Sequence, residues 1–212
     1  MILDDGFQHW KIERDLDIVL IDAMNPFGNY RLLPRGILRE PVTALKRADI
    51  IIITRTDAQP ARLEEIYMVI GQAGKTDSVI ESIYAPRGLY EISKGREMGL
   101  KIIDKRKICL VSSIGNPAYF RQKIERLGAA IEMEFTFMDH YNYKKRDFYK
   151  IDRECKFLEA EFIVVTKKDA VKIKRLALSN EVSIPILVFD VEFEITKNKR
   201  ILDERLSGIY SN

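Results

Sequence analysis

The chain has 212 residues, of which 46% are hydrophobic and 32% are charged. This length suits one large or two small domains, and this composition is that of a folded globular chain rather than a disordered or fibrous one. The 35 Lys and Arg residues against 32 Asp and Glu give a net charge of +3. Such a balance argues against non-specific binding to nucleic acid, so we expect no nucleic-acid partner.

The two cysteines, Cys109 and Cys155, are far apart in the sequence. This spacing excludes a disulfide scaffold and a zinc site built from cysteines, and it suits a reducing compartment. No apolar run approaches the roughly 18 residues that cross a bilayer, and no signal peptide precedes the first motif. We therefore expect no transmembrane segment in this chain.

Residues 1–3 are apolar and are followed directly by two aspartates. A buried strand that ends in paired carboxylates normally has four or more apolar residues before them, so we predict that residues 1–3 are the end of a strand. A central strand needs neighbours on both sides. We therefore expect the neighbouring strands to come from preceding sequence or from another polypeptide.

The next elements are two buried parallel strands and a helix. Residues 17–22 and 49–54 are apolar runs bounded by polar residues, and ligands of open α/β sheets lie beyond the carboxyl ends of such strands. Residues 60–73 are expected to form a helix with Pro60 in its first turn. Its expected buried face consists of Leu63, Ile66, Tyr67 and Ile70.

A second alternation of strands and helices begins near residue 84. Strands are expected at 84–92, 107–112, 131–137, 161–166 and 186–195, and helices at 118–127, 147–159, 170–178 and 201–210. This pattern predicts two α/β lobes. We expect a core lobe at 1–83, a linker at 84–107, a second smaller lobe at 108–185, and a return strand with a C-terminal helix at 186–212.

Asp4 and Asp5 are the most informative pair of residues. Adjacent carboxylates repel each other unless a cation or a hydrogen-bond donor is close. In nucleotide-binding folds such a pair holds the Mg²⁺ that bridges phosphate groups. The alternative is that both residues only begin a turn before Gly6. Gln8 and His9 follow directly, and these donors and acceptors favour a binding site.

A long connection rich in turn-forming residues follows at 25–36. It comes after a predicted strand end, which is where active-site loops lie. Arg31, Arg35 and Arg39 could neutralise phosphate groups there. The alternative is a surface loop with ordinary solvated arginines, and the loop taken alone slightly favours that alternative.

His140 is one of only two histidines in the chain. Asp139 could orient its ring or cap the following helix, and the sequence leaves these two possibilities even. The turn at 112–117 could offer backbone N–H groups to an anion, although a plain strand-to-helix connection is the simpler interpretation.

The stretch GQAGKT at 71–76 is not a phosphate-binding loop. Such a loop requires G-x-x-x-x-G-K-[ST], and Val69 stands where the first glycine belongs. We interpret Gly74 as the residue that ends a helix. The chain has no phosphate loop of its own.

Taken together, these motifs resemble one family. LDDGFQH at 3–9 and RDLDIVLID at 14–22 closely resemble tetraacyldisaccharide 4'-kinase, the lipid A 4'-kinase of Gram-negative bacteria. Further segments agree with that family in the same order and extend the match over essentially the whole chain. They are PFGN at 26–29, LLP at 32–34, REP at 39–41, IGNP at 114–117, DHY at 139–141 and KDAVK at 168–172.

The resemblance implies a phosphate-loop kinase with an α/β parallel-sheet lobe and a second α/β lobe, joined by a two-stranded linker. Such a kinase transfers the γ-phosphate of ATP to the 4'-hydroxyl of a tetraacyldisaccharide 1-phosphate, with Mg²⁺. The implied partners are the lipid disaccharide and the inner-membrane surface. The implied location is the cytoplasmic face of that membrane.

The resemblance also implies roles for single residues. Asp5 and His140 are expected in catalysis, with His140 assisting an aspartate base. Asp4 and Asp5 are expected to hold the metal, and Asp4 and Arg31 to bind the nucleotide. The expected substrate-binding residues are Gln8, His9, Asn29 and Arg35.

The sequence also departs from the family pattern. The family carries its phosphate loop, its catalytic aspartate and a membrane-contacting helix before the LDDGFQH segment. Tyr30 replaces a usual Gly and Lys167 a usual Glu. Because phosphoryl transfer depends on positioning the phosphates, we expect the chain to be inactive alone and to need an N-terminal half as partner.

Two further expectations follow from that departure. The lobe at 1–83 has a sheet edge without a neighbour, so we expect it to be poorly stable alone. The alternative function is a non-catalytic module that binds the lipid disaccharide or serves as a scaffold.

Overall fold

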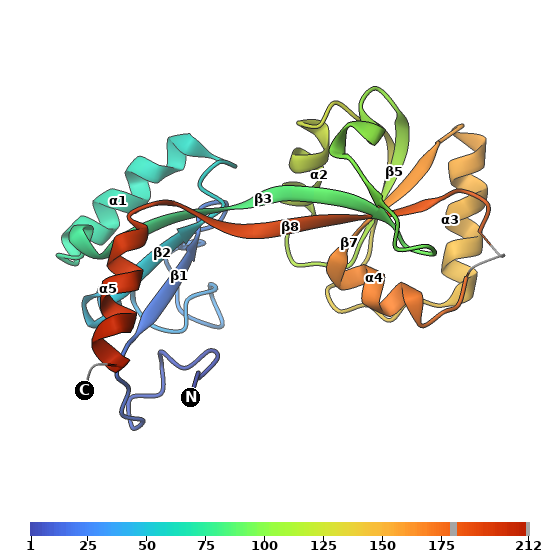
Figure 1. Cartoon of the computed structure of the whole chain (residues 1–212). Helices are drawn as coiled ribbons and strands as arrows, with labels where there is room; N and C mark the ends of the chain where they lie inside the picture. Colours follow the sequence, from blue (N-terminus) through green and yellow to red (C-terminus); the bar gives the residue numbers. More distant parts are fainter. Residues whose placement is uncertain (179–181, 211–212) are drawn as a thin grey trace. The chain divides into compact units, whose positions relative to one another are not determined.

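The computed structural model describes residues 1–178 and 182–210. Its strands follow one another in the order β1-β2-β3-β8-β7-β5-β6, with β4 paired to β3 (Figure 1). Neighbours from β1 to β3 are parallel, and so are the neighbours among β8, β7, β5 and β6. The short β4 (Glu97–Met98) runs antiparallel to β3. The predicted α/β class with a mostly parallel sheet is confirmed.

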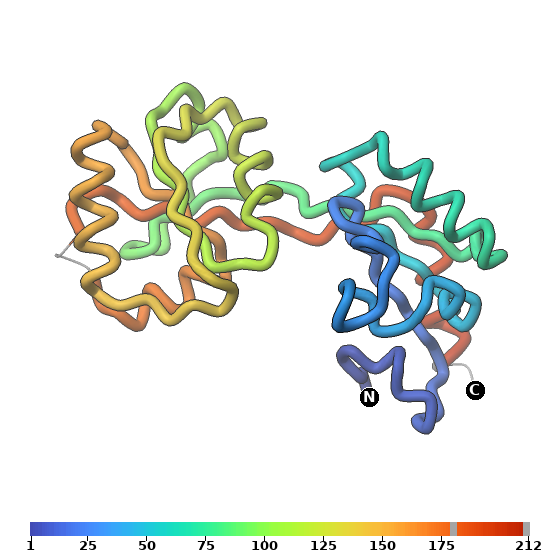
Figure 2. The backbone as a smooth tube through the Cα atoms, turned by 180° about the vertical axis from the view of Figure 1, so that it is seen from behind, coloured from blue at the N-terminus to red at the C-terminus, as the bar shows by residue number. Residues whose placement is uncertain are grey.

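The chain divides into two compact units. The first consists of Met1–Tyr84 with Phe193–Asn212, and the second of Ala85–Glu192. Two long strands, β3 (Val79–Glu91) and β8 (Ile186–Lys197), contribute residues to both units. The backbone passes from the first unit to the second along β3 and returns along β8 (Figure 2).

The central strand of the first unit is β2 (Ile50–Thr54), which lies between β1 (Ile18–Asp22) and β3. All five residues of β2 are buried, which explains its β-branched sequence. Because successive strand residues point to opposite faces, Ile51 and Ile53 pack in one cluster with α1, whereas Ile50 and Ile52 pack in another with α5.

The helices of the first unit cover these two faces. Helix α1 (Leu63–Gln72) buries Ile66 and Ile70 and packs Leu63 and Tyr67 against the same cluster, as predicted. Helix α5 (Lys199–Tyr210) packs Ile201 and Leu202 against β2 and β3.

The second unit repeats this arrangement around β5 (Lys107–Ser112), with β6 (Ala130–Thr136) on one side and β7 (Phe162–Thr166) on the other. Cys109 and Val111 face a core that includes residues of α3 (Lys145–Phe157) and α4 (Lys167–Lys174). Ile108 and Leu110 face the core that includes residues of α2 (Pro117–Glu125).

Residues 1–3 do not form the strand that we predicted. Their side chains are exposed, and β1 stands at one end of the strand order. No strand of the described residues lies on its free side. These residues therefore have no ladder of hydrogen bonds to join.

Other boundaries differ from the predictions for local reasons. Strand β3 begins at Val79 instead of residue 84. Helix α4 begins at Lys167 instead of residue 170, because the hydroxyl of Thr166 accepts the Asp169 backbone N–H and caps the helix there. Two unpredicted 3-10 helices are η1 (Val42–Arg47) and η4 (Leu100–Ile103).

Within residues 1–178 and 182–210, no helix combines the length and the apolar composition that crossing a bilayer requires.

Candidate active site

The paired aspartates lie in the first unit on residues 1–17, which precede β1 and contain no helix or strand. We call this segment the aspartate loop. Asp5 adopts a φ of +54°, a left-handed conformation that Asp tolerates better than most residues. Its carbonyl oxygen accepts a hydrogen bond from Gln8 Nε2 at 2.8 Å. The carbonyl oxygen of Gly6 accepts the backbone N–H of His9 at 2.9 Å. Two residues predicted to bind ligand, Asp5 and Gln8, are therefore in direct contact.

The two carboxylates have different surroundings. Asp5 Oδ2 lies 2.5 Å from Arg39 NH1, and both side chains are more than half exposed. Asp4 is exposed and makes no hydrogen bond or ion pair with the described residues. The sequence predicted that Arg39 could neutralise a phosphate group. In the structure, Arg39 neutralises Asp5.

The loop is anchored at two places. Arg14 NH1 donates to the carbonyl oxygens of Gly6 (3.2 Å) and His9 (2.7 Å), and Arg14 Nε lies 2.7 Å from Asp17 Oδ1. At the second place, Trp10 Nε1 donates to Glu40 Oε1 at 2.7 Å.

Glu40 also pairs with Arg47, at 2.8 Å. The hydrogen bond from Arg47 lowers the pKa of the Glu40 carboxyl, with a smaller contribution in the same direction from Trp10 and an opposing one from burial. Glu40 is therefore held in its charged form, which accepts stronger hydrogen bonds.

A cavity of about 270 Å³ lies beside this loop in the first unit. Apolar side chains form most of its wall, and Gln8, Arg39 and Glu40 add polar groups. An apolar wall with a few polar groups is typical of a small-molecule site. Its apolar lining includes Phe7, Val19, Phe27, Ile37 and Leu45.

The connection after β1 is held by its own polar groups. Asn29 Nδ2 donates to the Arg35 carbonyl oxygen (2.8 Å), and Asn29 Oδ1 accepts the Arg31 backbone N–H (3.1 Å). A Cβ at Gly36 would collide with the Arg31 carbonyl and with Asn29 Oδ1, so this position requires glycine. The Asn29 amide thus shapes the loop on which the Arg31 and Arg35 side chains are exposed.

Tyr30 takes the left-handed conformation that a glycine would adopt easily, with a φ of +58°. Its hydroxyl donates to Glu65 Oε1 at 2.5 Å, and this hydrogen bond raises the pKa of Tyr30. The contact with α1 compensates for the unfavourable backbone conformation. The departure from the family pattern is therefore accommodated without loss of the turn.

In the second unit, three neighbouring parallel strands end beside the remaining motifs. Because parallel strands bring their carboxyl ends to one edge, the segments after β5, β6 and β7 lie close together. A Cβ at Gly115, which follows β5, would lie 3.5 Å from Asp139 Oδ2, which follows β6. Asn116 Oδ1 accepts the Tyr119 N–H at 3.1 Å and caps α2.

His140 is exposed at this edge, with 88% of its side chain accessible and a φ of +59°. Asp139 Oδ1 accepts the backbone N–H of His140 at 2.9 Å, and Asp139 Oδ2 lies 3.9 Å from His140 Nε2. The next helix is capped by other residues, because Asp147 Oδ2 accepts the Lys144 N–H. Asp139 therefore does not cap this helix, and its hydrogen bond holds the backbone of His140, not the ring.

A buried aspartate fixes the turn after β5. Asp169 is fully buried, and its carboxylate accepts hydrogen bonds from the backbone N–H and the hydroxyl of Ser113 and from the hydroxyl of Thr166. Lys172 Nζ donates to Ser113 Oγ at 2.8 Å and lies 3.8 Å from Asp169 Oδ1. This network connects the IGNP and KDAVK segments.

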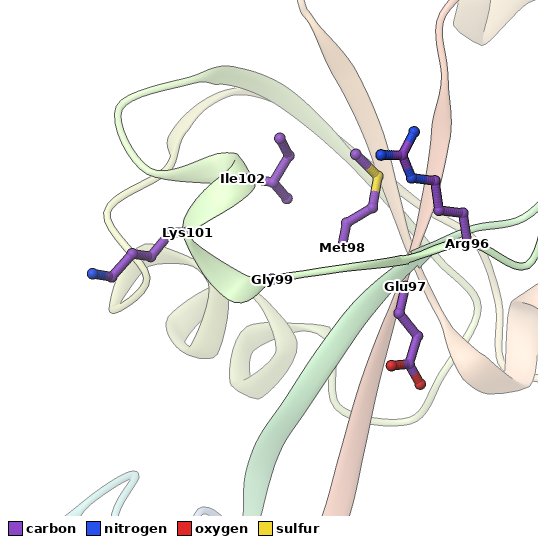
Figure 3. A pocket seen from close by; sticks show the side chains of 6 residues that line it. All are labelled: Arg96, Glu97, Met98, Gly99, Lys101 and Ile102. Carbon is purple, nitrogen blue, oxygen red and sulfur yellow. The ribbon is translucent and has the colours of Figure 1, made fainter.

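A second pocket, of about 480 Å³, lies in the second unit around β4 and η4 (Figure 3). It is lined by Arg96, Glu97, Met98, Gly99, Lys101 and Ile102. None of the residues predicted from the sequence lines it. The predicted residues and this pocket are therefore separate features.

Comparison with known proteins identifies the family to which these motifs belong. A model of the family described as tetraacyldisaccharide-1-P 4'-kinase matches residues 1–209. The chain belongs to this family. The match includes both the aspartate loop and the His140 segment, as the resemblance implied.

Curated relatives in this kinase family are longer than the chain. The tetraacyldisaccharide 4'-kinase of Syntrophus aciditrophicus (strain SB) is 38% identical over 209 residues, which cover 94% of this chain and 54% of the relative. That of Halothermothrix orenii is 38% identical and covers 82% of this chain and 48% of the relative. A probable mitochondrial tetraacyldisaccharide 4'-kinase of Arabidopsis thaliana is 35% identical, covering 80% and 45%. The chain spans about half the length of the curated relatives it matches.

A solved structure agrees with the fold. The crystal structure of LpxK from Aquifex aeolicus in complex with ATP matches with a TM-score of 0.62 and 22% sequence identity. The match covers 98% of this chain and 56% of that chain. At this identity the likeness supports the fold alone.

The resemblance implies Mg²⁺, with Asp4 and Asp5 as the residues that would hold it. Among residues 1–178 and 182–210, no three His, Cys, Asp or Glu side chains gather closely enough to hold a metal by themselves. Mg²⁺, however, is usually held by one or two carboxylates together with phosphates and water. The accessible Asp4 carboxylate beside Asp5 fits that mode and does not fit an all-protein cage.

Sequence reasoning missed the residues that hold these motif segments in place. Trp10, Glu40, Arg47 and Asp169 were assigned no role, although each makes several contacts with a motif segment. Their partners are distant in the chain: Trp10 is 30 residues from Glu40, and Ser113 is 56 from Asp169. No local pattern signals such contacts.

Replacing Asp169 with Ala should destabilise the second unit by about 3 kcal/mol, because it leaves the buried donors of Ser113 without their acceptor and the Lys172 ammonium without the nearby carboxylate. Urea unfolding measures this loss. The matched control is Lys168→Ala on the same helix turn, an exposed position where a change within about 0.5 kcal/mol is expected. Equal effects of the two substitutions would show that the network is not a stabilising element.

Protonation of Glu40 should release Trp10. Since the folded pKa of Glu40 is lowered, the contact is intact at neutral pH and is lost as the pH falls through a value below 4.5, the ordinary one. Trp10 is the only tryptophan, so its fluorescence reports this step. Glu40→Gln should abolish the step and Glu13→Gln, at an exposed position of the same loop, should not. A step that persists in Glu40→Gln contradicts the assignment.

Proposed function

We propose that this chain forms part of a tetraacyldisaccharide 4'-kinase, which transfers the γ-phosphate of ATP to the 4'-hydroxyl of tetraacyldisaccharide 1-phosphate. The observation that carries this proposal is the family match over residues 1–209. The chain spans about half of its relatives and contains no phosphate-loop sequence. Because phosphate positioning dominates phosphoryl transfer, activity requires a further segment that carries such a loop.

In this proposal, the first unit binds the metal and the phosphates. Asp4 and Asp5 hold Mg²⁺, which when bound neutralises charge on the phosphates. Asp4 is accessible for this role, and Asp5 would give up only an exposed ion pair with Arg39 to take it. Such an exchange is inexpensive, because an exposed ion pair contributes at most about 1 kcal/mol.

Other residues of the first unit bind nucleotide and substrate. Arg31 contacts the nucleotide phosphates, and Arg35 contacts the 1-phosphate of the disaccharide. Both side chains are exposed on a loop whose backbone Asn29 fixes. Gln8 at the cavity wall and His9 next to it contact the sugar.

The second unit supplies His140 for proton transfer. Its ring is exposed and lies 3.9 Å from Asp139 Oδ2, so a carboxylate is near the group that would exchange the proton. In the proposal, His140 assists the aspartate base that removes the proton from the 4'-hydroxyl. That base belongs to the segment outside this chain.

Part of the connection after β1 suits contact with lipid. Leu32, Leu33 and Ile37 are 45%, 61% and 54% exposed, and Arg31 and Arg35 lie between and beside them. Exposed apolar side chains next to cations suit the surface of an anionic membrane. This combination supports a location at the cytoplasmic face of the inner membrane.

The proposal predicts that ³²P passes from [γ-³²P]ATP to tetraacyldisaccharide 1-phosphate only when the chain is coexpressed with the segment that its longer relatives have in addition. In that complex, Asp5→Asn should lower kcat because Mg²⁺ would lose a carboxylate ligand, and His140→Gln should lower kcat by about 10²- to 10⁴-fold, the range for loss of an acid–base group. Thin-layer chromatography of the labelled lipid measures the rate.

The matched control is Asp15→Asn, an exposed aspartate on the same loop, which should leave the rate unchanged. Full activity of both Asp5→Asn and His140→Gln would contradict the assigned roles. Binding of the disaccharide without phosphate transfer in the complete complex would favour the alternative, a binding module.

A further inference from the structure

Arg47 makes more contacts with the aspartate loop than any motif residue does. It is the last residue of η1 and precedes β2. Its NH1 lies 2.8 Å from Glu40 Oε2, and its NH2 donates to the Phe7 carbonyl oxygen at 3.2 Å. Its guanidinium carbon lies 4.5 Å from the ring centroid of Phe7 and 4.5 Å from that of Trp10.

These contacts require the shape of an arginine. The guanidinium is planar, so its edge donates to oxygens while its faces meet aromatic rings. A lysine ammonium at this place would keep the charge but could not make the two hydrogen-bonded contacts and the two ring contacts together. Arg47 is only 32% exposed at its side chain, which strengthens each of these interactions.

The contacts of Arg47 lead directly to the carboxylate pair. Phe7 lies two residues after Asp5 in the aspartate loop. Glu40 is the neighbour of Arg39, which forms the ion pair with Asp5. Arg47 therefore restrains two segments: the part of the loop that carries Asp5, and the segment that carries Arg39, the ion-pair partner of Asp5.

The loop has little else to order it. Among residues 1–17, only Gly6 is fully buried, so the hydrophobic contribution to its position is small. Arg14 donates to the carbonyl oxygens of Gly6 and His9. Without Arg47, Phe7 and Trp10 would lose the guanidinium that both rings contact. The loop would then rely on the Arg14 contacts, the Trp10–Glu40 hydrogen bond and the exposed Asp5–Arg39 pair.

We propose that Arg47 is a positioning residue that sets the arrangement of Asp4 and Asp5 for a divalent cation. It acts by holding the Phe7–Trp10 segment against Glu40. This inference rests on the proposed function, in which the two carboxylates hold Mg²⁺. It assigns this positioning role to a residue that touches the neighbours of the carboxylates and lies 40 positions after Phe7 in the chain.

The first measurement uses Trp10, the single tryptophan, in the 212-residue chain. Because Trp10 is already 70% exposed and Arg47 restrains its ring, the readout is mobility: the fluorescence anisotropy of the indole should fall in Arg47→Ala and fall less in Arg47→Lys. The matched control is Lys46→Ala, which removes the same charge from an exposed position of the same helix. Far-UV circular dichroism checks that each variant is folded, and Arg47→Lys serves as the test if Arg47→Ala is not. Unchanged anisotropy in the folded Arg47 variants overturns the proposal.

The second measurement is binding of Mn²⁺, a stand-in for Mg²⁺, followed by electron paramagnetic resonance and reversed by added Mg²⁺. Loss of a residue that orients metal ligands typically weakens binding by about 10- to 100-fold. We expect a loss in this range for Arg47→Ala, a smaller one for Arg47→Lys and none for Lys46→Ala. A merely structural role would change the unfolding midpoint and leave the Mn²⁺ affinity of the folded protein unaltered.

The outcomes separate the two claims. Wild-type binding that Arg47→Ala does not weaken overturns this inference and leaves the proposed function standing. Absence of Mn²⁺ binding in the wild-type chain refutes the metal role of Asp4 and Asp5, and the inference with it. Weaker Mn²⁺ binding in Arg47→Ala together with lower anisotropy of Trp10 supports both.

Discussion

Ion pairs and arginine–aromatic contacts, rather than a hydrophobic core, hold the loop that carries the paired carboxylates. The Asp5–Arg39 pair is more than half exposed, so it contributes little stability. The Glu40–Arg47 pair is more buried and also engages Trp10. The Asp5–Arg39 pair can therefore be broken at low cost, whereas the Glu40–Arg47 pair keeps the loop in position. This combination suits a site that binds a charged ligand.

In the second unit, a buried carboxylate holds the motif segments together. The parallel strands of this unit deliver three motif segments to one edge, and the buried Asp169 joins two of these segments through Ser113 and Thr166. A buried carboxylate with all these donors is costly to disturb. His140 is exposed beside this rigid support. A rigid support with an accessible ring suits the proton-transfer role that we propose for His140.

The sequence was a good guide wherever local pattern determines structure. The β-branched run correctly predicted β2, because a strand buried on both faces is apolar throughout. The spacing of Ile66 and Ile70 correctly predicted α1, because one buried face of a helix repeats every three to four residues. The sequence failed for residues 1–3, since an apolar run forms a strand only when a neighbouring strand is present. The 3-10 helix that places Arg47 has no such period and was not predicted.

The site was only partly accessible from the sequence. The motifs led to the right family, and the adjacency of Asp5 and Gln8 follows from their spacing on one turn. The Asp5–Arg39 pair and the contacts of Arg47 join segments that are distant in the chain. Local propensity and periodicity therefore cannot predict these contacts. The roles of the individual site residues remain predictions.

Hydrogen–deuterium exchange of the chain with and without ATP and Mg²⁺ tests most directly where the ligand binds. We predict that protection increases in residues 4–10 and 25–41 and stays constant in α1, whose amides are already protected by the helix. Protection that arises instead around residues 96–102, or no change anywhere in the first unit, would contradict the placement of the site at the aspartate loop.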